Sequence, residues 1–207
     1  MRKEVFTVIA ASLLLVGCMS NTTEEQPENS AKEPVETSEM QPKPSAEIDR
    51  EPSKEFVQSV EGQDEVIQMN LVKGQDSLYS MYVDQERYQF GEAGEKDVLT
   101  PTVPVPTGYP EVKMEILYIE DRNPDGVKQD FEKEYAFPLE EQAVTSPVDA
   151  LSFHGTSGTE PDSEVVTIYL LNAFGGTLLI EDRYFLEAQE GHGARFEQML
   201  ETLELNK

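Results

Sequence analysis

The chain has 207 residues, 41 of them Asp or Glu and 16 Lys or Arg, so its formal net charge is −25 at neutral pH. This charge argues against DNA or RNA as a partner, because phosphate binding needs clustered Lys and Arg side chains. The single cysteine excludes an internal disulfide framework and a cysteine-rich zinc site. A length of 207 residues predicts one domain with additional segments. Apolar residues make up 38% of the chain, which is below the average of globular proteins and predicts that part of the chain does not fold.

The N-terminus has the features of a secretory signal. A short charged start, 1–4, precedes an apolar run over 5–16, which is too short to span a membrane as a helix. The run leads into Leu15-Val16-Gly17-Cys18, which resembles the lipobox of bacterial lipoproteins. The resemblance implies a signal peptide over 1–17 and a diacylglycerol on the sulfur of Cys18. The alternative is an ordinary buried cysteine after a membrane anchor.

Residues 18–54 follow the predicted cleavage site. Between 19 and 54 there are nine acidic residues, four basic residues and five prolines. Such a composition buries too little apolar surface to offset the entropy of ordering, so we predict a disordered, acidic, proline-rich tether. As a flexible coil it would span on the order of 30 Å. A partner-binding tail is the alternative, and the globular domain is predicted over 55–207.

The domain begins with strand patterns. Runs of β-branched and aromatic residues separated by turn residues predict two hairpins, the first joining 56–60 to 66–72 and the second joining 78–83 to 87–90. Four prolines and a glycine argue against regular structure over 100–110. Alternating apolar residues predict a strand over 112–119.

A helix is predicted next, because Asn123 can cap it, Pro124 suits its first position and Asp125 favours the positive end of its dipole. Further strands are predicted at 148–153, 165–171 and 177–186. The second of these is apolar on both faces, as expected for a central, covered strand, and two glycines turn it into the third. Apolar residues at helical spacing predict a last helix over 193–205.

This order predicts an α+β fold: a mostly antiparallel β-sheet flanked by helices, with a C-terminal amphipathic helix. The segments 79–83, Asn123-Pro124 with its helix, and 184–187 leading into 194–196 resemble the layout of the PsbP-like superfamily over roughly 78–205. The resemblance implies a non-enzymatic accessory or binding role, although fold alone does not transfer function. The block 184–196 also resembles uncharacterised lipoproteins of Gram-positive bacteria.

One segment matches the calcium-loop pattern D-x-[DN]-x-[DN]-G-x₅-E, with Asp121, Asn123, Asp125 and Glu132 as its oxygen ligands. Against it, Lys128 stands where EF-hand loops carry an apolar residue, and the preceding segment is strand-like. The start of a helix already explains these residues, so no metal site is predicted and the calcium loop over 121–132 is an alternative.

Two histidines are the only imidazoles in the chain. His154 precedes a Gly-Thr-Ser-Gly turn that lacks the G-x-S-x-G spacing of a nucleophile elbow. His192 lies between two glycines before the last helix, where a turn is the favoured interpretation and a ligand site for an anion the alternative. The abundant acidic pairs indicate a solvated surface. No catalytic residue is therefore predicted.

We predict an extracytoplasmic lipoprotein anchored in the lipid bilayer through Cys18. Its domain would bind an unidentified envelope protein or ligand, without a cofactor and without catalysing a reaction. The alternatives are a small cell-envelope hydrolase and a calcium-binding module. Polar groups that converge on either histidine would favour the hydrolase, whereas a flat or wholly apolar groove would favour binding.

Overall fold

The computed structural model describes residues 49–60, 63–131 and 134–206. These residues belong to one compact unit, Lys43–Lys207. Residues 1–48, which include Cys18 and most of the predicted tether, lie outside the described residues, as does Glu132. Among the residues that the structure describes, no helix is long and apolar enough to cross a membrane.

The described strands form two sheets in which every pair is antiparallel. The smaller sheet has the order β1 (Ser53–Val60), β2 (Gln63–Lys73), β3 (Tyr79–Val83) and β11 (Glu204–Leu205). The larger sheet has the order β4 (Tyr88–Ala93), β5 (Lys96–Pro101), β6 (Lys113–Ile119), β10 (Gly176–Phe185), β9 (Glu164–Ala173), β8 (Ala150–Thr156) and β7 (Glu140–Val144). The α+β prediction is confirmed.

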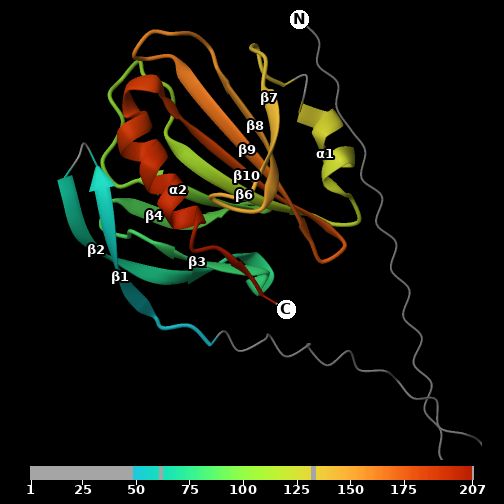
Figure 1. Ribbon diagram of the computed structural model, residues 1–207, viewed down its shortest axis with the longest axis horizontal. Coiled ribbons are helices and arrows are strands. Elements are labelled where there is room, and N and C mark those ends of the chain that lie inside the picture. Colours follow the sequence, from blue (N-terminus) through green and yellow to red (C-terminus); the bar gives the residue numbers. More distant parts are fainter. Residues whose placement is uncertain (1–48, 61–62, 132–133, 207) are drawn as a thin grey trace, which may run out of the picture. The chain divides into compact units, whose positions relative to one another are not determined.

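Two helices accompany the sheets (Figure 1). Helix α1 (Pro124–Phe131) packs on one face of the larger sheet, where the ring of Phe131 lies 5.1 Å from that of Phe153. Helix α2 (Ala194–Leu200) and the smaller sheet cover the other face. Strand β9 is therefore buried on both sides, which confirms the prediction of a covered strand: Ile168 faces α1, and Tyr169 faces the main core.

The first predicted hairpin, β1–β2, is confirmed, but the second is wrong. Strands β3 and β4 do not pair, because the chain passes from the smaller to the larger sheet between them. The buried carboxylate of Asp84 makes this turn: it accepts the backbone N–H groups of Glu86 and Arg87 at 3.2 and 3.3 Å. Strand β4 pairs instead with β5, which the sequence analysis did not predict.

The last predicted helix is too long. It ends at Leu200, and the chain then forms β11 beside β3. Thr202 fixes this change of direction, because its hydroxyl donates to the carbonyl of Met199 at 2.6 Å and accepts the N–H of Tyr82 at 2.8 Å. The apolar spacing beyond Leu200 thus belongs to a turn and a short strand that satisfy the free backbone groups of β3.

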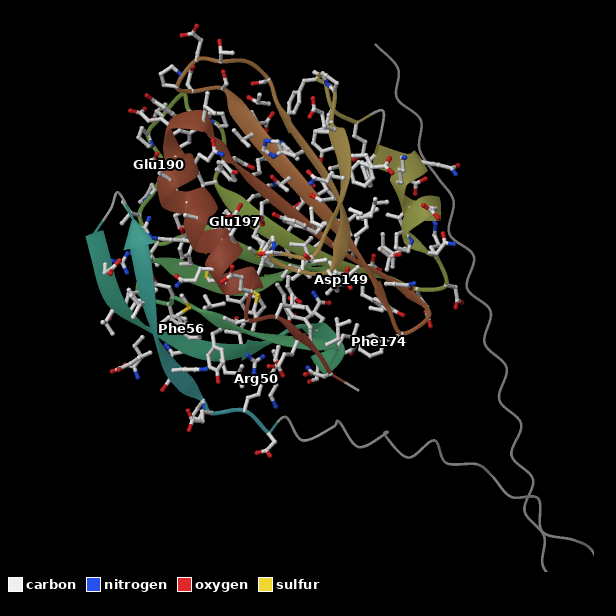
Figure 2. The ribbon with its side chains drawn as sticks, viewed as in Figure 1. Arg50, Phe56, Asp149, Phe174, Glu190 and Glu197 are labelled. Carbon is white, nitrogen blue, oxygen red and sulfur yellow. The ribbon has the colours of Figure 1, made fainter. Side chains whose placement is uncertain are left out.

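Arg50, near the beginning of the described residues, forms hydrogen bonds with β3 and with the C-terminal segment. Its guanidinium donates to the carbonyl of Ser80 at 3.0 Å and to that of Thr202 at 2.8 Å. It also lies over the ring of Tyr82, 4.6 Å from the centroid. Figure 2 shows Arg50 beside the smaller sheet. These contacts, together with strand β1 from Ser53, place ordered structure within the end of the predicted tether, 18–54.

Candidate functional site

A hollow of about 420 Å³ lies between the proline-rich segment after β5 and the turn that leads into α2. We call it the His192 pocket. Its walls are mostly apolar, and most of its polar groups come from the turn into β4 and from the beginning of α2 with the turn before it. The residues that line it are Glu86, Arg87, Tyr88, Pro101, Thr102, Val103, Pro104, Val105, Pro106, Phe185, His192 and Arg195.

Proline chemistry explains the apolar wall. Prolines have no N–H to donate to a strand ladder, so the chain leaves the sheet after Pro101 and its apolar side chains have no partner strand to cover them. Val103 is 76% exposed as a result. Phe185 also lines the pocket, and its ring packs edge-on against the ring of Tyr109, with 4.7 Å between the two centroids.

The polar side of the pocket is built on an unusual helical turn. A 3₁₀ turn (Leu186–Ala188) and a π-helical turn (Gln189–Gly193) precede α2, and His192 lies in the π-helical turn. Gly193 leaves room for Tyr184 there, because a Cβ atom at this position would lie 3.0 Å from the Tyr184 ring, a tight contact. Single π-helical turns are rare in proteins, and those that occur are frequently found at functional sites.

His192 and Tyr88 form a hydrogen-bonded pair in this pocket, with 2.8 Å between the Tyr88 hydroxyl and Nδ1 of His192. Burial, and then the charge of Arg195, lower the pKa of His192. Burial raises the pKa of Tyr88. At neutral pH the imidazole is therefore uncharged and the phenol keeps its proton, so the pair offers polar contacts but no charge of its own.

The two arginines of the pocket differ in their partners. The Arg87 guanidinium forms ion pairs with Asp84 and Glu65, each at 2.9 Å. Arg195 forms no ion pair with any residue that the structure describes, and its buried Nε atom has no hydrogen-bond partner. Within the described part of the chain, Arg195 is thus a cation without a carboxylate partner, and it lines a mostly apolar pocket.

The structure separates the residues that the sequence analysis singled out. His192 lies in the pocket, whereas His154 is exposed on β8 and pairs with the Thr167 hydroxyl at 3.0 Å. Asn123 caps α1, as predicted, by accepting the N–H of Gly126 at 2.9 Å. Because Glu132 lies outside the described residues, the calcium loop stays an untested alternative, and lipidation of Cys18, which also lies outside them, stays a prediction.

Three partners of His192 were missed: Tyr88, Arg195 and the proline-rich wall. Tyr88 is distant in sequence, and only the folded sheet brings it to the helix turn. Arg195 follows His192 by three residues, but no pattern in the sequence distinguishes it from other surface arginines. The proline-rich segment carried the one usable signal, because four prolines interleaved with valines predict an apolar surface that cannot join a sheet.

Comparisons with known proteins show similarity in structure only. No family model matches the chain, and no curated protein matches it in sequence. The similar solved structures include the Ran-binding protein Mog1p of Saccharomyces cerevisiae, with 10% identity and a TM-score of 0.44 over 66% of this chain and 95% of that one. They also include PsbP of the cyanobacterium Synechocystis, with 6% identity and a TM-score of 0.43 over 66% and 92%.

A protein from Bacteroides thetaiotaomicron is similar at 12% identity and a TM-score of 0.42, and the similarity covers 66% of this chain. The chain spans about half the length of that protein, 48%. The α+β class follows from the strands and helices of this chain.

Proposed function

We propose that the protein is a lipoprotein held at the outer face of the cell membrane by a diacylglycerol on Cys18, and that its domain binds a small organic anion in the His192 pocket without catalysing a reaction. The location rests on the apolar run that ends in Leu15-Val16-Gly17-Cys18. One acyl chain holds a protein only marginally, but two hold it stably, so such a modification replaces a membrane-spanning helix.

The Nε donor of Arg195, which has no hydrogen-bond partner, carries the binding proposal. A buried donor without a partner costs free energy, and a ligand carboxylate, sulfonate or phosphate would supply the missing acceptor through a charge-assisted hydrogen bond. The uncharged His192–Tyr88 pair lies beside it and can add polar contacts. Prolines and valines of the opposite wall suit an apolar body, and the volume falls in the range of small-molecule sites.

A matched pair of ligands tests this proposal. We expect 4-phenylbutyrate to bind the purified full-length protein in isothermal titration calorimetry, and 4-phenylbutylamine, which has a similar body and the opposite charge, not to compete with it for the His192 pocket. Replacing Arg195 with Gln should weaken 4-phenylbutyrate binding by about 10- to 100-fold, because the anion loses its charged donor.

Lys73→Gln provides the matched control, because it removes the same charge from an exposed position on β2, outside the pocket. Its affinity for 4-phenylbutyrate should equal that of the wild type. Equal losses in the two variants would show that only the net charge matters, and displacement of 4-phenylbutyrate by the amine would contradict an anion site.

The anchor is tested independently of the pocket. We expect Cys18→Ala to abolish lipid attachment, because alanine has no sulfur to carry the diacylglycerol. The variant protein should be released into the medium or retain its signal peptide, as measured by cell fractionation and intact-mass spectrometry. A mature wild-type protein with an unmodified thiol, or one that begins at another residue, would contradict the proposed location.

The hydrolase alternative has one observation in its favour, namely that Tyr88 and Arg195 converge on His192. Of the residues that line the pocket, only Thr102 has an aliphatic hydroxyl, and this group already donates to the carbonyl oxygens of Glu86 and Arg87 at 3.1 Å. Turnover of p-nitrophenyl butyrate by the wild type that is lost in His192→Gln would establish the hydrolase and overturn a purely binding role.

A further inference from the structure

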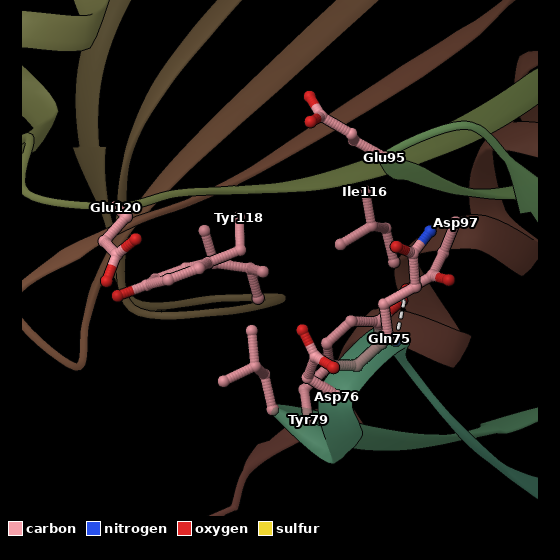
Figure 3. A pocket seen from close by; sticks show the side chains of 10 residues that line it. Gln75, Asp76, Tyr79, Glu95, Asp97, Ile116, Tyr118 and Glu120 are labelled. Carbon is pink, nitrogen blue, oxygen red and sulfur yellow. Dashed lines mark hydrogen bonds between the residues drawn. The ribbon is translucent and has the colours of Figure 1, made fainter. Parts of the chain in front are cut away.

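A second hollow, of about 370 Å³, lies between the 3₁₀ turn η1 (Gln75–Ser77) and strands β5 and β6. We call it the Asp97 pocket (Figure 3). Its chemistry is opposite to that of the His192 pocket, because four carboxyl groups line it and none of its ten lining residues is a Lys, Arg or His. The four are Asp76, Glu95, Asp97 and Glu120.

Asp97 is the deepest of these acids. Only 3% of its surface is exposed, because position 97 of β5 points into the space between the two sheets. Its Oδ2 atom accepts the Tyr79 hydroxyl at 2.7 Å and the backbone N–H of Gln75 at 3.0 Å. Its Oδ1 atom is buried and has no hydrogen-bond partner. A buried carboxylate oxygen without a donor is costly and is rare in folded proteins.

No basic side chain that the structure describes is available to neutralise Asp97. The neighbouring Lys96 points to the opposite face of the sheet, where it forms an ion pair with Glu115 at 2.8 Å. The hydroxyl of Tyr79 and the N–H of Gln75 are both used on Oδ2. No described residue supplies the missing donor at Oδ1, so water or a cationic ligand could supply it.

The remaining walls match an alkyl chain better than a hydrated ion. Ile116 and Leu178 are buried apolar residues of the lining, and Tyr79 and Tyr118 contribute aromatic rings. Rings of this kind attract organic cations. Figure 3 shows Asp97 at one end of the hollow and Glu120 at the other, so a linear ligand meets an acid at each end.

We propose that the Asp97 pocket binds an alkyl ammonium group, with the ammonium at Asp97 and the carbon chain along the apolar walls. A divalent metal ion is less well suited, because Ca²⁺ takes six to eight oxygen ligands. Among the described residues, nowhere do three acidic, histidine or cysteine side chains lie close enough together to hold a metal ion. Free diamines and lysine side chains of a partner protein both present the required group.

Calorimetry on the purified full-length protein tests this site with defined ligands. We expect 1,5-diaminopentane and N-acetyl-lysine methylamide to bind, and sodium pentanoate, an anion of similar length, not to compete with them at up to about 10 mM. Tighter binding of the diamine, through its second ammonium at Glu120, would assign the site to free diamines, whereas equal affinities would assign it to lysine side chains. Failure of both amines to bind would overturn the proposal.

Asp97→Asn keeps the shape of the side chain and removes its charge, so amine affinity should fall by about 10-fold or more. The control is Glu92→Gln, which removes one charge from an exposed position of β4 outside the pocket and should leave the affinity unchanged. A second variant is needed because Asp97→Asn also alters buried hydrogen bonds. Glu120→Gln, at the exposed end of the pocket, should weaken binding of the diamine more than binding of the lysine derivative. Unchanged affinities in both pocket variants, or displacement of the amines by stoichiometric CaCl₂, would overturn the proposal.

Discussion

Replacing Phe196 with alanine is expected to destabilise the domain by about 3–5 kcal/mol, the usual cost of emptying a fully buried phenylalanine site. Phe196 is completely buried on α2, and its ring lies 5.3 Å from that of Tyr88 on the larger sheet. The backbone of α2 is held between the two sheets and cannot collapse into the space left behind. Urea unfolding followed by circular dichroism measures the loss as a lower transition midpoint.

Phe174→Ala is the matched control. This residue is 47% exposed at the tip of the β9–β10 hairpin (Figure 2), and its truncation should cost less than about 1 kcal/mol. Because the two variants remove the same atoms, the difference between them reports burial alone. Similar losses in both would contradict the position of α2 between the sheets.

Asp182→Asn is expected to stabilise the protein at neutral pH. Asp182 lies on β10, facing the main core, and is buried, with one carboxyl oxygen lacking a hydrogen-bond partner. Burial, then the charges of Glu197 and Glu181, raise the pKa of this carboxyl well above its ordinary value. In the unfolded chain the group ionises near pH 4, but in the folded chain it retains its proton to higher pH.

The pH dependence follows from this difference. Above pH 4 the folded state holds one proton more than the unfolded state, so the wild type loses stability as the pH rises, by up to about 1.4 kcal/mol per pH unit, until Asp182 ionises in the folded state. Asparagine does not titrate, so the variant escapes this loss. The two proteins should be similarly stable at pH 4, and the variant should gain relative to the wild type towards pH 7.

Urea unfolding at a series of pH values between 4 and 8 measures the difference between the two proteins. Asp149→Asn serves as the control, because Asp149 is exposed (Figure 2) and its replacement should give a difference that does not change with pH. A stability difference between Asp182→Asn and the wild type that is constant across this range would show that the carboxyl titrates equally in both states.

Two elements could be predicted because the residues that define them are neighbours in the sequence. The strand over 165–171 was identified because apolar residues at every position need cover on both faces, and β9 has α1 on one side and the main core on the other. Asn123-Pro124 identified the start of α1 because capping depends only on neighbouring residues.

Elements that depend on distant partners could not be predicted in this way. Strand β5 alternates only weakly, since Asp97 occupies an inward position that the pattern treats as polar surface. The end of α2 is set by Thr202 and by the free edge of β3, which lies more than a hundred residues earlier in the chain. Helical spacing continues past Leu200 by coincidence, so periodicity alone extended the helix.

The candidate site shows the same limit. His192 was noted because a histidine between glycines is conspicuous, but its hydrogen-bonded partner Tyr88 is separated from it by 104 positions. A single side chain can be suspected from its neighbours in sequence, whereas the guanidinium and the apolar wall that give the pocket its chemistry are assembled by the crossing of the chain between two sheets.

Arg50 is the first described residue at which a force applied to the N-terminal segment would act on the domain. If the protein is anchored at Cys18, as we propose, tension along the polypeptide reaches Arg50 before strand β1, and the Arg50 guanidinium donates hydrogen bonds to the carbonyls of Ser80 and Thr202. The force is therefore distributed over β3 and the C-terminal segment. It does not act directly on the pairing between β1 and β2.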